Sequence, residues 1–355
     1  MVSPQKYAKN RITNSIIKFK NFQYKADFKL QKHKNQAIFE ETFKSDKSGN
    51  VRQNEHTLYM EKQKDIIAWW SGGVTSAVTC KICIDTYSKE RVRVIFIDTH
   101  NEHEDTYRFK KDCEQWYGID IETISNIGDK YEKIQDVWTK HKSLNVAHGA
   151  VCSSELKRNA REKWEKNNEF TYQAFGFDVD ETRRAKGMKL NHSRAKPIFP
   201  LLMHYYSKKD CINIIQDSGI EVPVMYKMGF LNNNCFKTGC VQGGIGYWQK
   251  MKRDFPEKFE AMGKVEHDLT KLKGTPVTML KDQSKGGGLV FLKPHPDYPD
   301  VKDITMMKGR EPKPLFECNG FCGVNDLEER KPEEQDINYQ IDLFDSIDEV
   351  KKANK

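Results

Sequence analysis

Short apolar runs alternate with amphipathic segments along the chain from residue 65 onward. Ile66–Trp70 is a continuous apolar run with the length of a buried parallel strand, and Ser71-Gly72-Gly73 ends it. Apolar residues then recur at helical spacing from Val74 to Ile82, and Val92–Ile97 is a second apolar run. The pattern predicts a strand, a helix and a second strand in that order.

The same alternation continues to residue 176. A polar helix is predicted over 103–117, a third strand over 119–124 and a fourth over 172–175, which Gly176 ends. Polar residues gather where the predicted strands end. Alternating strands and helices predict an α/β fold with a doubly wound, mostly parallel sheet, whose ligand lies beyond the carboxyl ends of the strands.

The flanking regions differ in texture from this α/β segment. We divide the chain into a basic N-terminal extension (1–64), the α/β domain (65–230), an irregular cysteine-containing region (231–323) and an acidic tail expected to be flexible (324–355). Within the extension, apolar and basic residues alternate over 16–30, which favours a short hairpin. Further along, we predict a helix over 208–218, a glycine-rich loop over 281–288 and a helix held in the core by Trp248.

The turn after the first predicted strand has the composition of a phosphate-binding loop. The glycines of Ser71-Gly72-Gly73-Val74-Thr75-Ser76 let the backbone approach a ligand closely, and the following helix offers N–H groups and positive dipole character to phosphate oxygens. We expect the hydroxyls of Ser71, Thr75 and Ser76 to add donors. The loop lacks the Gly-Lys-Ser/Thr of a Walker motif. An ordinary strand-to-helix turn is the alternative.

Several segments in the right order resemble one family. The SGGxxS loop is similar to the PP-loop of ATP pyrophosphatases and phosphoadenosine phosphosulfate (PAPS) reductases, although Thr75 stands where the ATP-using branch often has Asp. Three further segments resemble PAPS reductases, especially a type carried by phages and mobile elements: Phe96–Phe109 with His100 in place of a usual glycine, Gly149–Arg158, and Gly176–Arg184. The resemblance covers about residues 65–260 and implies an adenine nucleotide alpha hydrolase-like fold.

Charged residues in these segments supply candidate ligand contacts. Lys157, Arg183 and Arg184 carry donors suited to phosphate or sulfate oxygens and are our candidate catalytic cations, with surface solvation as the alternative. Asp98 and Thr99 end the second strand. There Asp98 is a candidate ligand for Mg²⁺ or a ribose hydroxyl, or simply a turn residue.

The nine cysteines do not suggest a disulfide framework, because the chain is long and their number is odd. Cys235 and Cys240 form one close pair, and Cys318 and Cys322 another. Together they predict a four-thiolate site for Zn²⁺ or a 4Fe–4S cluster. Alternatively, Cys318 is a catalytic nucleophile, by its partial likeness to the mobile cysteine of the reductases, or the pairs are structural.

The remaining cysteines have other expected roles. Cys152 lies where related enzymes place cluster ligands, while Cys80, Cys83, Cys113 and Cys211 are predicted to pack inside helices. The three asparagines 232–234 precede the first pair, and either a ligand or a turn explains them.

Charge and composition narrow the cellular setting. The net charge is +8, and residues 1–64 carry 14 Lys or Arg against 6 Asp or Glu, so this arm is either a contact for nucleic acid or a solvated surface. No apolar stretch is long enough for a membrane span, and no secretory signal is visible. We therefore expect a cytoplasmic protein.

The sequence leaves three functions open. The resemblance implies an enzyme that binds ATP or PAPS and either reduces a sulfonucleotide or activates a substrate for sulfur transfer, with a thiol as electron or sulfur donor. An ATP-dependent nucleic-acid-modifying enzyme of the thiolation type is the second possibility. The third is a non-catalytic nucleotide-binding protein in host–phage conflict. The sequence does not indicate an oligomeric state.

Overall fold

The computed structural model describes residues 66–146, 149–313 and 315. The chain divides into two units, Met1–Gln63 and Lys64–Lys355, and all described residues belong to the second. The hairpin expected over 16–30 and the acidic tail from 324 lie outside the described residues. No helix in the described part of the chain combines the length and the apolar character needed to cross a membrane.

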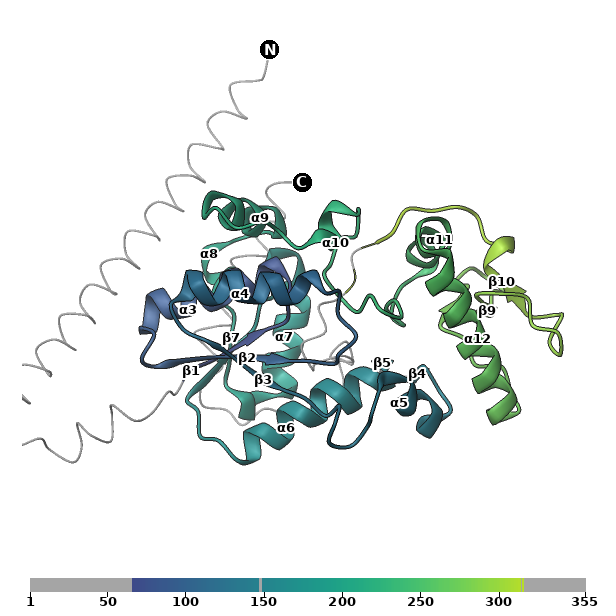
Figure 1. The fold of residues 1–355 in the computed structure, drawn as a ribbon, viewed down its shortest axis with the longest axis horizontal. Helices are drawn as coiled ribbons and strands as arrows, with labels where there is room; N and C mark the ends of the chain where they lie inside the picture. Colours follow the sequence, from purple (N-terminus) through teal and green to yellow (C-terminus); the bar gives the residue numbers. More distant parts are fainter. Residues whose placement is uncertain (1–65, 147–148, 314, 316–355) are drawn as a thin grey trace, which may run out of the picture. The chain divides into compact units, whose positions relative to one another are not determined.

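A five-stranded parallel sheet forms the centre of the described unit (Figure 1). Its order is β3-β2-β1-β6-β7, so the direction in which strands are added reverses between β1 and β6. This is the switch point of a doubly wound sheet, where ligands bind beyond the carboxyl ends of the strands. The strands are β1 Ile66–Trp70, β2 Val92–Ile97, β3 Ile121–Ile124, β6 Tyr172–Ala174 and β7 Pro197–Ile198.

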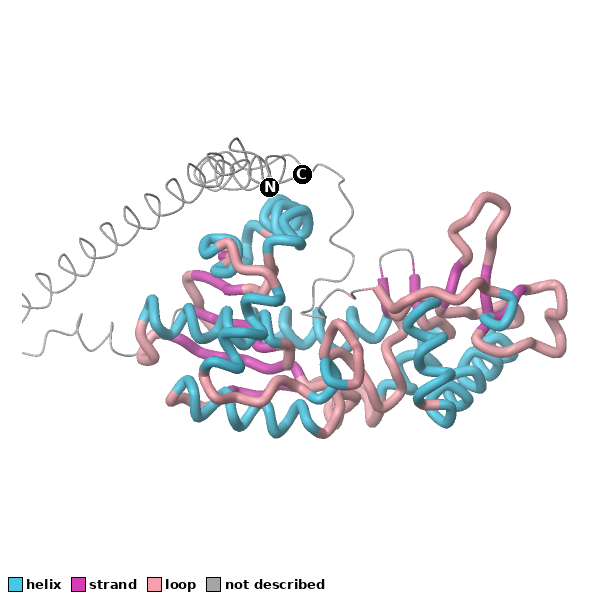
Figure 2. Tube along the Cα trace, turned by 90° about the horizontal axis from the view of Figure 1, so that it is seen from above, coloured by secondary structure: helices cyan, strands magenta, loops and turns pink. Residues whose placement is uncertain are grey.

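Helices cover both faces of this sheet because the inner strands are apolar on both sides (Figures 1 and 2). Trp70 belongs to the core against α3, α4 and α9, whereas Trp69, its neighbour in sequence, belongs to the core against α6, α7 and α8. Neighbouring residues of a strand point to opposite faces. The helices are α3 Val74–Tyr87, α4 Asp105–Tyr117, α6 Asn159–Lys166, α7 Thr182–Asn191, α8 Pro200–His204 and α9 Lys208–Asp217.

A third hydrophobic cluster joins the remaining elements. Trp138 of α5 and Leu156 contribute to it together with Trp248, Phe259 and Val290 from the chain beyond residue 243. The elements are α5 Ile134–His141, β4 Asn145–Val146, β5 Gly149–Ala150, a π-helical turn Ser153–Arg158, α10 Val224–Lys227, α11 Ile245–Asp254, α12 Pro256–Lys273, β8 Leu280–Lys281, β9 Leu289–Phe291 and β10 Lys302–Asp303. Short 3₁₀ turns lie at Val179–Glu181, Ser193–Ala195 and Ile304–Met306.

The predicted α/β fold is confirmed, with small shifts in bounds. β1, α3 and β2 begin where the pattern placed them, while α4 and β3 each begin two residues later than expected. The expected helix around Trp248 is α11, and Trp248 is fully buried. The region beyond 231 is more regular than expected, because α12 and a three-stranded sheet of β10, β9 and β8 lie there.

Candidate functional site

The turn between β1 and α3 is the predicted phosphate loop. Ser76 Oγ accepts hydrogen bonds from Ser71 N at 3.0 Å and Ser71 Oγ at 2.9 Å, and donates to Gly73 O at 2.9 Å. Gly72 has a φ of +88°, and Gly73 is the N-cap of α3, which no side chain caps. Within the described residues, the N–H groups of Gly72 and Gly73 have no hydrogen-bond partner. Such amides at a helix start are suited to an anion.

Neighbouring backbone packs closely around this loop. A Cβ on Gly176, which lies just beyond β6, would stand 2.8 Å from the Cα and N of Ser76. Thr75 and Ser76 are buried. The Ser76 hydroxyl, expected as a donor to phosphate, makes hydrogen bonds within the loop in this structure. The loop can therefore offer its backbone amides more readily than this hydroxyl.

Two buried carboxylates follow β2: the predicted Asp98, and Glu102, which contacts the predicted Thr99. Asp98 accepts hydrogen bonds from Tyr107 Oη at 3.0 and 3.1 Å and from the backbone N of His100 at 2.7 Å. Thr99 Oγ1 donates to Glu102 Oε1 at 2.8 Å. Both carboxyls are thus fixed at the carboxyl edge of the sheet, where the topology places the ligand.

Burial has the largest effect on the pKa of Glu102, which it raises. The positive charge of Lys157 lowers this pKa, and the negative charge of Asp98 raises it further. Lys157 Nζ lies 3.9 Å from Glu102 Oε1, and the lysine itself is buried. Burial, together with the charges of Asp98 and Glu102, also raises the pKa of Tyr107, which keeps its hydroxyl protonated. A buried lysine beside Glu102 can compensate negative charge at this edge of the sheet.

The predicted arginines of α7 differ in environment. Arg184 is buried, pairs with Glu181 and lies over the Phe177 ring, with its Cζ 4.5 Å from the ring centroid. Arg183 is exposed to solvent. Arg184 therefore packs within the domain, whereas Arg183 is accessible to a ligand.

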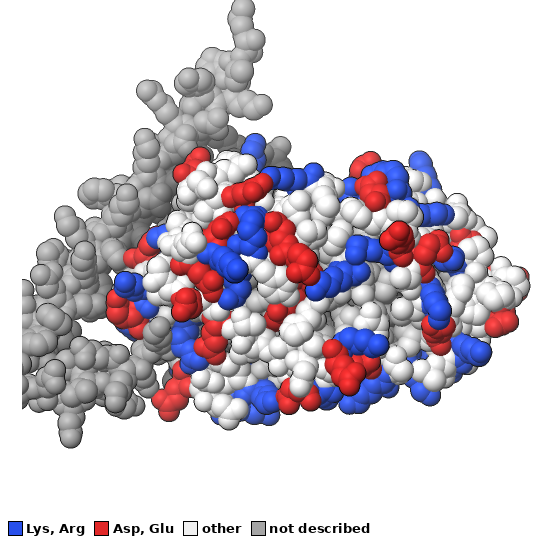
Figure 3. Space-filling model, viewed as in Figure 1, with Lys and Arg blue, Asp and Glu red and all other residues white. Residues whose placement is uncertain are grey.

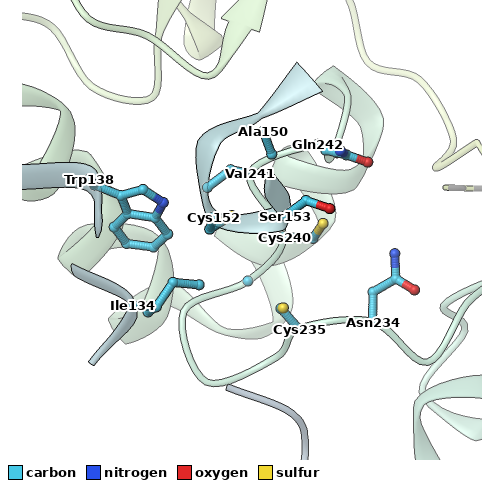
Figure 4. Close-up of a pocket in the computed structure, with 11 residues that line it drawn as sticks. Ile134, Trp138, Ala150, Cys152, Ser153, Asn234, Cys235, Cys240, Val241 and Gln242 are labelled. Carbon is cyan, nitrogen blue, oxygen red and sulfur yellow. The ribbon is translucent and has the colours of Figure 1, made fainter. Parts of the chain in front are cut away.

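Three cysteines from distant parts of the chain line one pocket (Figure 4). Cys152 precedes the π-helical turn, while Cys235 and Cys240 belong to the segment before α11. Trp138 supplies an apolar wall. The Sγ of Cys235 lies 3.9 Å from Thr99 Oγ1, which connects the pocket to the end of β2. Cys152, which lies where related enzymes place cluster ligands, is thus brought together with the predicted pair Cys235 and Cys240.

The other described cysteines are core residues, as predicted. Cys80, Cys83, Cys113 and Cys211 are fully buried. Burial raises the pKa of Cys83 and of Cys113 to about 12 in each case, so these thiols stay protonated near neutral pH. Cys80 and Cys83 thus pack into the core beneath α3.

The described residues do not by themselves fit a resident metal. No three His, Cys, Asp or Glu side chains among them are arranged to hold a metal ion. Cys318 and Cys322, the second predicted pair, lie outside the described residues. The four-cysteine site therefore stays a prediction.

The segment 232–240 is fixed to the carboxyl edge of the sheet by contacts of Asn101 and Asn233, of which the sequence had singled out only Asn233. Asn101 O accepts hydrogen bonds from the backbone N of Phe236 at 2.9 Å and of Lys237 at 3.1 Å. Asn233 Nδ2 donates to Gly72 O at 2.8 Å and to Thr106 Oγ1 at 3.1 Å. The asparagine run was the only signal of this contact.

These features define an α/β protein with a glycine-containing turn, the predicted phosphate loop, at the switch point of a parallel sheet. The chain belongs to the phosphoadenosine phosphosulfate reductase domain family, whose model matches residues 65–243.

Known proteins give more distant similarities. The chain is 26% identical over 209 residues to an uncharacterised protein of Methanocaldococcus jannaschii, a match that covers 57% of this chain and 41% of the relative. The match therefore spans less than half of that relative's length.

Three solved structures resemble the fold. A PAPS reductase from Candida auris in a phosphate complex has 15% identity and a TM-score of 0.37, covering 51% of this chain and 86% of that one. An NH3-dependent NAD synthetase from Campylobacter jejuni has 13% identity and a TM-score of 0.32, and the match covers 62% of this chain and 87% of that one. A U34-tRNA thiolase from Methanococcus maripaludis with its [4Fe–4S] cluster has 14% identity and a TM-score of 0.28, and the match covers 76% of this chain and 94% of that one. Similarities this low support no conclusion about activity.

Proposed function

We propose that this chain is an adenine-nucleotide-dependent enzyme that reduces a sulfonucleotide of the PAPS type. The nucleotide phosphates bind at Ser71–Ser76, and cysteine thiols act on the sulfur. The observation that carries the proposal is that one short segment contacts both the predicted phosphate loop and the cysteine pocket. Asn233 contacts the phosphate loop at Gly72, and two residues later Cys235 lines the thiol pocket. Membership of the PAPS reductase domain family supports the same chemistry.

Phosphate capture is assigned to backbone amides and cations. The amides of Gly72 and Gly73 lie at the start of α3, where the helix dipole favours negative charge. Lys157 and Arg183 are proposed to stabilise the charge that develops on the leaving phosphate, together with Arg184, whose guanidinium lies inside the domain beside Glu181. Of these, Lys157 is buried close to the carboxyl edge, beside Glu102, so its charge acts with little screening by water.

The proposed reaction needs two thiols and a nucleotide that carries sulfate on phosphate. A thiolate attacks the sulfur, and the bond from sulfur to the phosphate oxygen breaks. The bisphosphate leaves with the electron pair, and an S-sulfocysteine forms. A second thiolate then attacks the cysteine sulfur, which releases sulfite and leaves a disulfide. An external dithiol reduces this disulfide. Cys318 is the proposed first nucleophile, and the pocket cysteines supply the second thiol.

ATP-dependent thiolation of a nucleic acid is the second candidate. The buried carboxylates of Asp98 and Glu102 at the carboxyl edge favour it, because carboxylate oxygens are the ligands that the Mg²⁺ of a bound ATP requires. The face drawn in Figure 3 intersperses Lys and Arg with Asp and Glu, so that face offers a polymer no continuous basic track.

Calorimetric titration with PAPS and with ATP, combined with assays of turnover, separates these candidates. We expect PAPS binding and release of sulfite in the presence of a dithiol. Lys157→Met should weaken PAPS binding by about tenfold or more, since it removes a buried cation. Lys163→Met, which removes an exposed cation paired with Asp129, should leave it unchanged.

Each other outcome has a definite meaning. ATP cleavage without PAPS binding supports the thiolation candidate. Nucleotide binding without any turnover supports a non-catalytic protein. A protein that binds neither nucleotide contradicts the proposal as a whole.

A further inference from the structure

Asn233 lies between the phosphate loop and the pocket cysteines. Its side-chain amide donates to Gly72 O at 2.8 Å and to Thr106 Oγ1 at 3.1 Å, and the residue is only 4% exposed. A Cβ on Gly72 would lie 2.9 Å from Thr106 Cγ2 and 3.5 Å from Asn233 Nδ2. The two side chains therefore pack directly against the backbone of the phosphate loop.

This contact carries specific chemical requirements. Both hydrogen bonds use the NH₂ group of Asn233 as donor, so a carboxylate of the same shape could not replace it. The Asn233 Oδ1 atom is buried and has no hydrogen-bond partner among the described residues. A buried acceptor without a partner costs about 1–3 kcal/mol, so the side chain is held here by its two donated bonds at a cost in stability.

The Gly72 carbonyl and the Gly73 N–H belong to the same peptide group. Within the described residues, that N–H has no partner, and it stands at the start of α3. When an anion accepts from the N–H of a peptide group, polarisation makes the carbonyl of that group a stronger acceptor. A phosphate at Gly73 N would therefore strengthen the bond from Asn233 to Gly72 O on the other side of the peptide.

Cys235 follows Asn233 by two residues, and further contacts hold the same segment. Its Sγ lies 3.9 Å from Thr99 Oγ1, and the next two backbone N–H groups donate to Asn101 O. Cys235 is half-buried, unlike the core cysteines. Its access to reagents thus depends on how firmly residues 233–235 are held.

We propose that Asn233 is a positioning residue that couples occupancy of the phosphate loop to the reactivity of Cys235. Nucleotide phosphate tightens the contact between Asn233 and Gly72, residues 233–235 become less mobile, and Cys235 reacts more slowly with external reagents. The coupling keeps the thiol from side reactions while nucleotide is bound. This inference rests on the proposed binding of nucleotide phosphates at Ser71–Ser76.

The test measures the rate at which iodoacetamide alkylates Cys235 in the full chain, followed by peptide mass spectrometry. It is run without ligand and with saturating ATP or adenosine 3′,5′-bisphosphate, whose binding is titrated independently. In the unmodified protein, we expect bound nucleotide to slow alkylation by about fivefold. In Asn233→Ala and Asn233→Leu, nucleotide still binds, but the slowing is lost.

Asn232→Ala is the matched control. Asn232 is the neighbouring buried asparagine, and its Oδ1 accepts from Leu315 N at 2.8 Å, away from the phosphate loop. Its variant should keep the nucleotide-dependent slowing.

Two results overturn the inference and leave the proposed function standing. Slowing that persists in an Asn233 variant that binds nucleotide means that the ligand shields Cys235 directly. Equal alkylation rates with and without bound nucleotide in the unmodified protein mean that there is no coupling. Because Leu has the same branched arrangement of heavy side-chain atoms as Asn, Asn233→Leu decides the matter if Asn233→Ala fails to fold. A protein that binds neither nucleotide contradicts the proposed function itself, and this inference with it.

Discussion

Close approach of backbone segments limits which residues the phosphate loop tolerates. Gly176 stands where any Cβ would lie 2.8 Å from the backbone of Ser76, and backbone atoms cannot move aside as a flexible side chain can. We predict that Gly176→Ala displaces the loop, destabilises the fold by about 1–3 kcal/mol and weakens nucleotide binding by about tenfold or more. Urea denaturation and calorimetric titration measure the two effects.

Gly288→Ala is the control for this substitution. No atom lies within 4 Å of the position of its Cβ, so this variant should keep both stability and binding. Unchanged nucleotide affinity in a folded Gly176→Ala protein would show that the loop does not need this close contact.

His100 illustrates what the sequence could predict at one position. The resemblance marked it as standing where glycine is usual, and the structure gives it a φ of +55°, in the left-handed region that glycine favours. Histidine is among the residues that tolerate this region, and Asp98 Oδ1 accepts from its backbone N. The turn is therefore kept despite the substitution.

Other residues of the site could not be predicted in the same way. The core cysteines followed from their position within predicted helices. Asn233, in contrast, contacts Gly72 across 161 positions of the sequence, and no local pattern encodes such a pairing. Cys152 joins Cys235 and Cys240 for the same reason, through the third hydrophobic cluster rather than through sequence spacing.

Among the elements, those with unbroken apolar runs were the most predictable. β1 and β2 are buried on both faces and begin and end as expected. α12 was missed, although Pro256 at its start and Gly274 with a φ of +77° after its end are typical signals of helix ends. Its apolar residues pack against β8 and β9, short strands whose pattern is too brief to recognise.

α12 also carries a buried acid that connects it to these strands. Glu266 accepts hydrogen bonds from Met279 N at 2.7 Å and Leu292 N at 2.6 Å, and it is fully buried. Burial raises its pKa to about 8, although both hydrogen bonds oppose the rise. The folded protein therefore holds this proton at pH values where the unfolded chain has released it.

We predict that this proton makes stability fall with rising pH. Its contribution is fully present below pH 4.5, and it declines by up to about 1.4 kcal/mol per pH unit until pH reaches the folded pKa of about 8. Glu266→Gln cannot titrate, so its stability should vary less over this window. Urea denaturation at several pH values between 5 and 8 measures the slope.

Asp268→Asn in the same helix is the control. Asp268 is exposed and pairs with Lys264, so its loss should not alter the slope. A slope that is the same in Glu266→Gln and in the unmodified protein would assign the pH dependence to other groups.

At the scale of the whole described unit, the third hydrophobic cluster extends beyond the segment that the family model matches. The family model stops at residue 243, yet the third hydrophobic cluster combines Trp138 and Leu156, before that point, with Trp248 and Phe259 after it. Trp138 lines the cysteine pocket and packs in the same cluster as residues of α11 and α12, so these two helices support the candidate site indirectly. The sequence could not reveal this dependence, because the region after 231 looked irregular.

We therefore predict that a chain of residues 65–243 is far less stable than one of residues 65–315. The shorter chain exposes Trp138 and Leu156, which are buried in the complete protein, and burial of such side chains contributes about 1.5–3 kcal/mol each. Circular dichroism during heating should give a cooperative transition for the longer chain and a lower, broader one for the shorter, with self-association visible on gel filtration. Equal transition temperatures would mean that the family-matched segment folds independently, and that the α11–α12 region does not support the thiol pocket.

Trp138→Ala in the longer chain tests the same packing without truncation. It removes the side chain through which the two regions contact each other, while both regions remain present. It should lower the transition temperature and loosen the environment of Cys152 and Cys235.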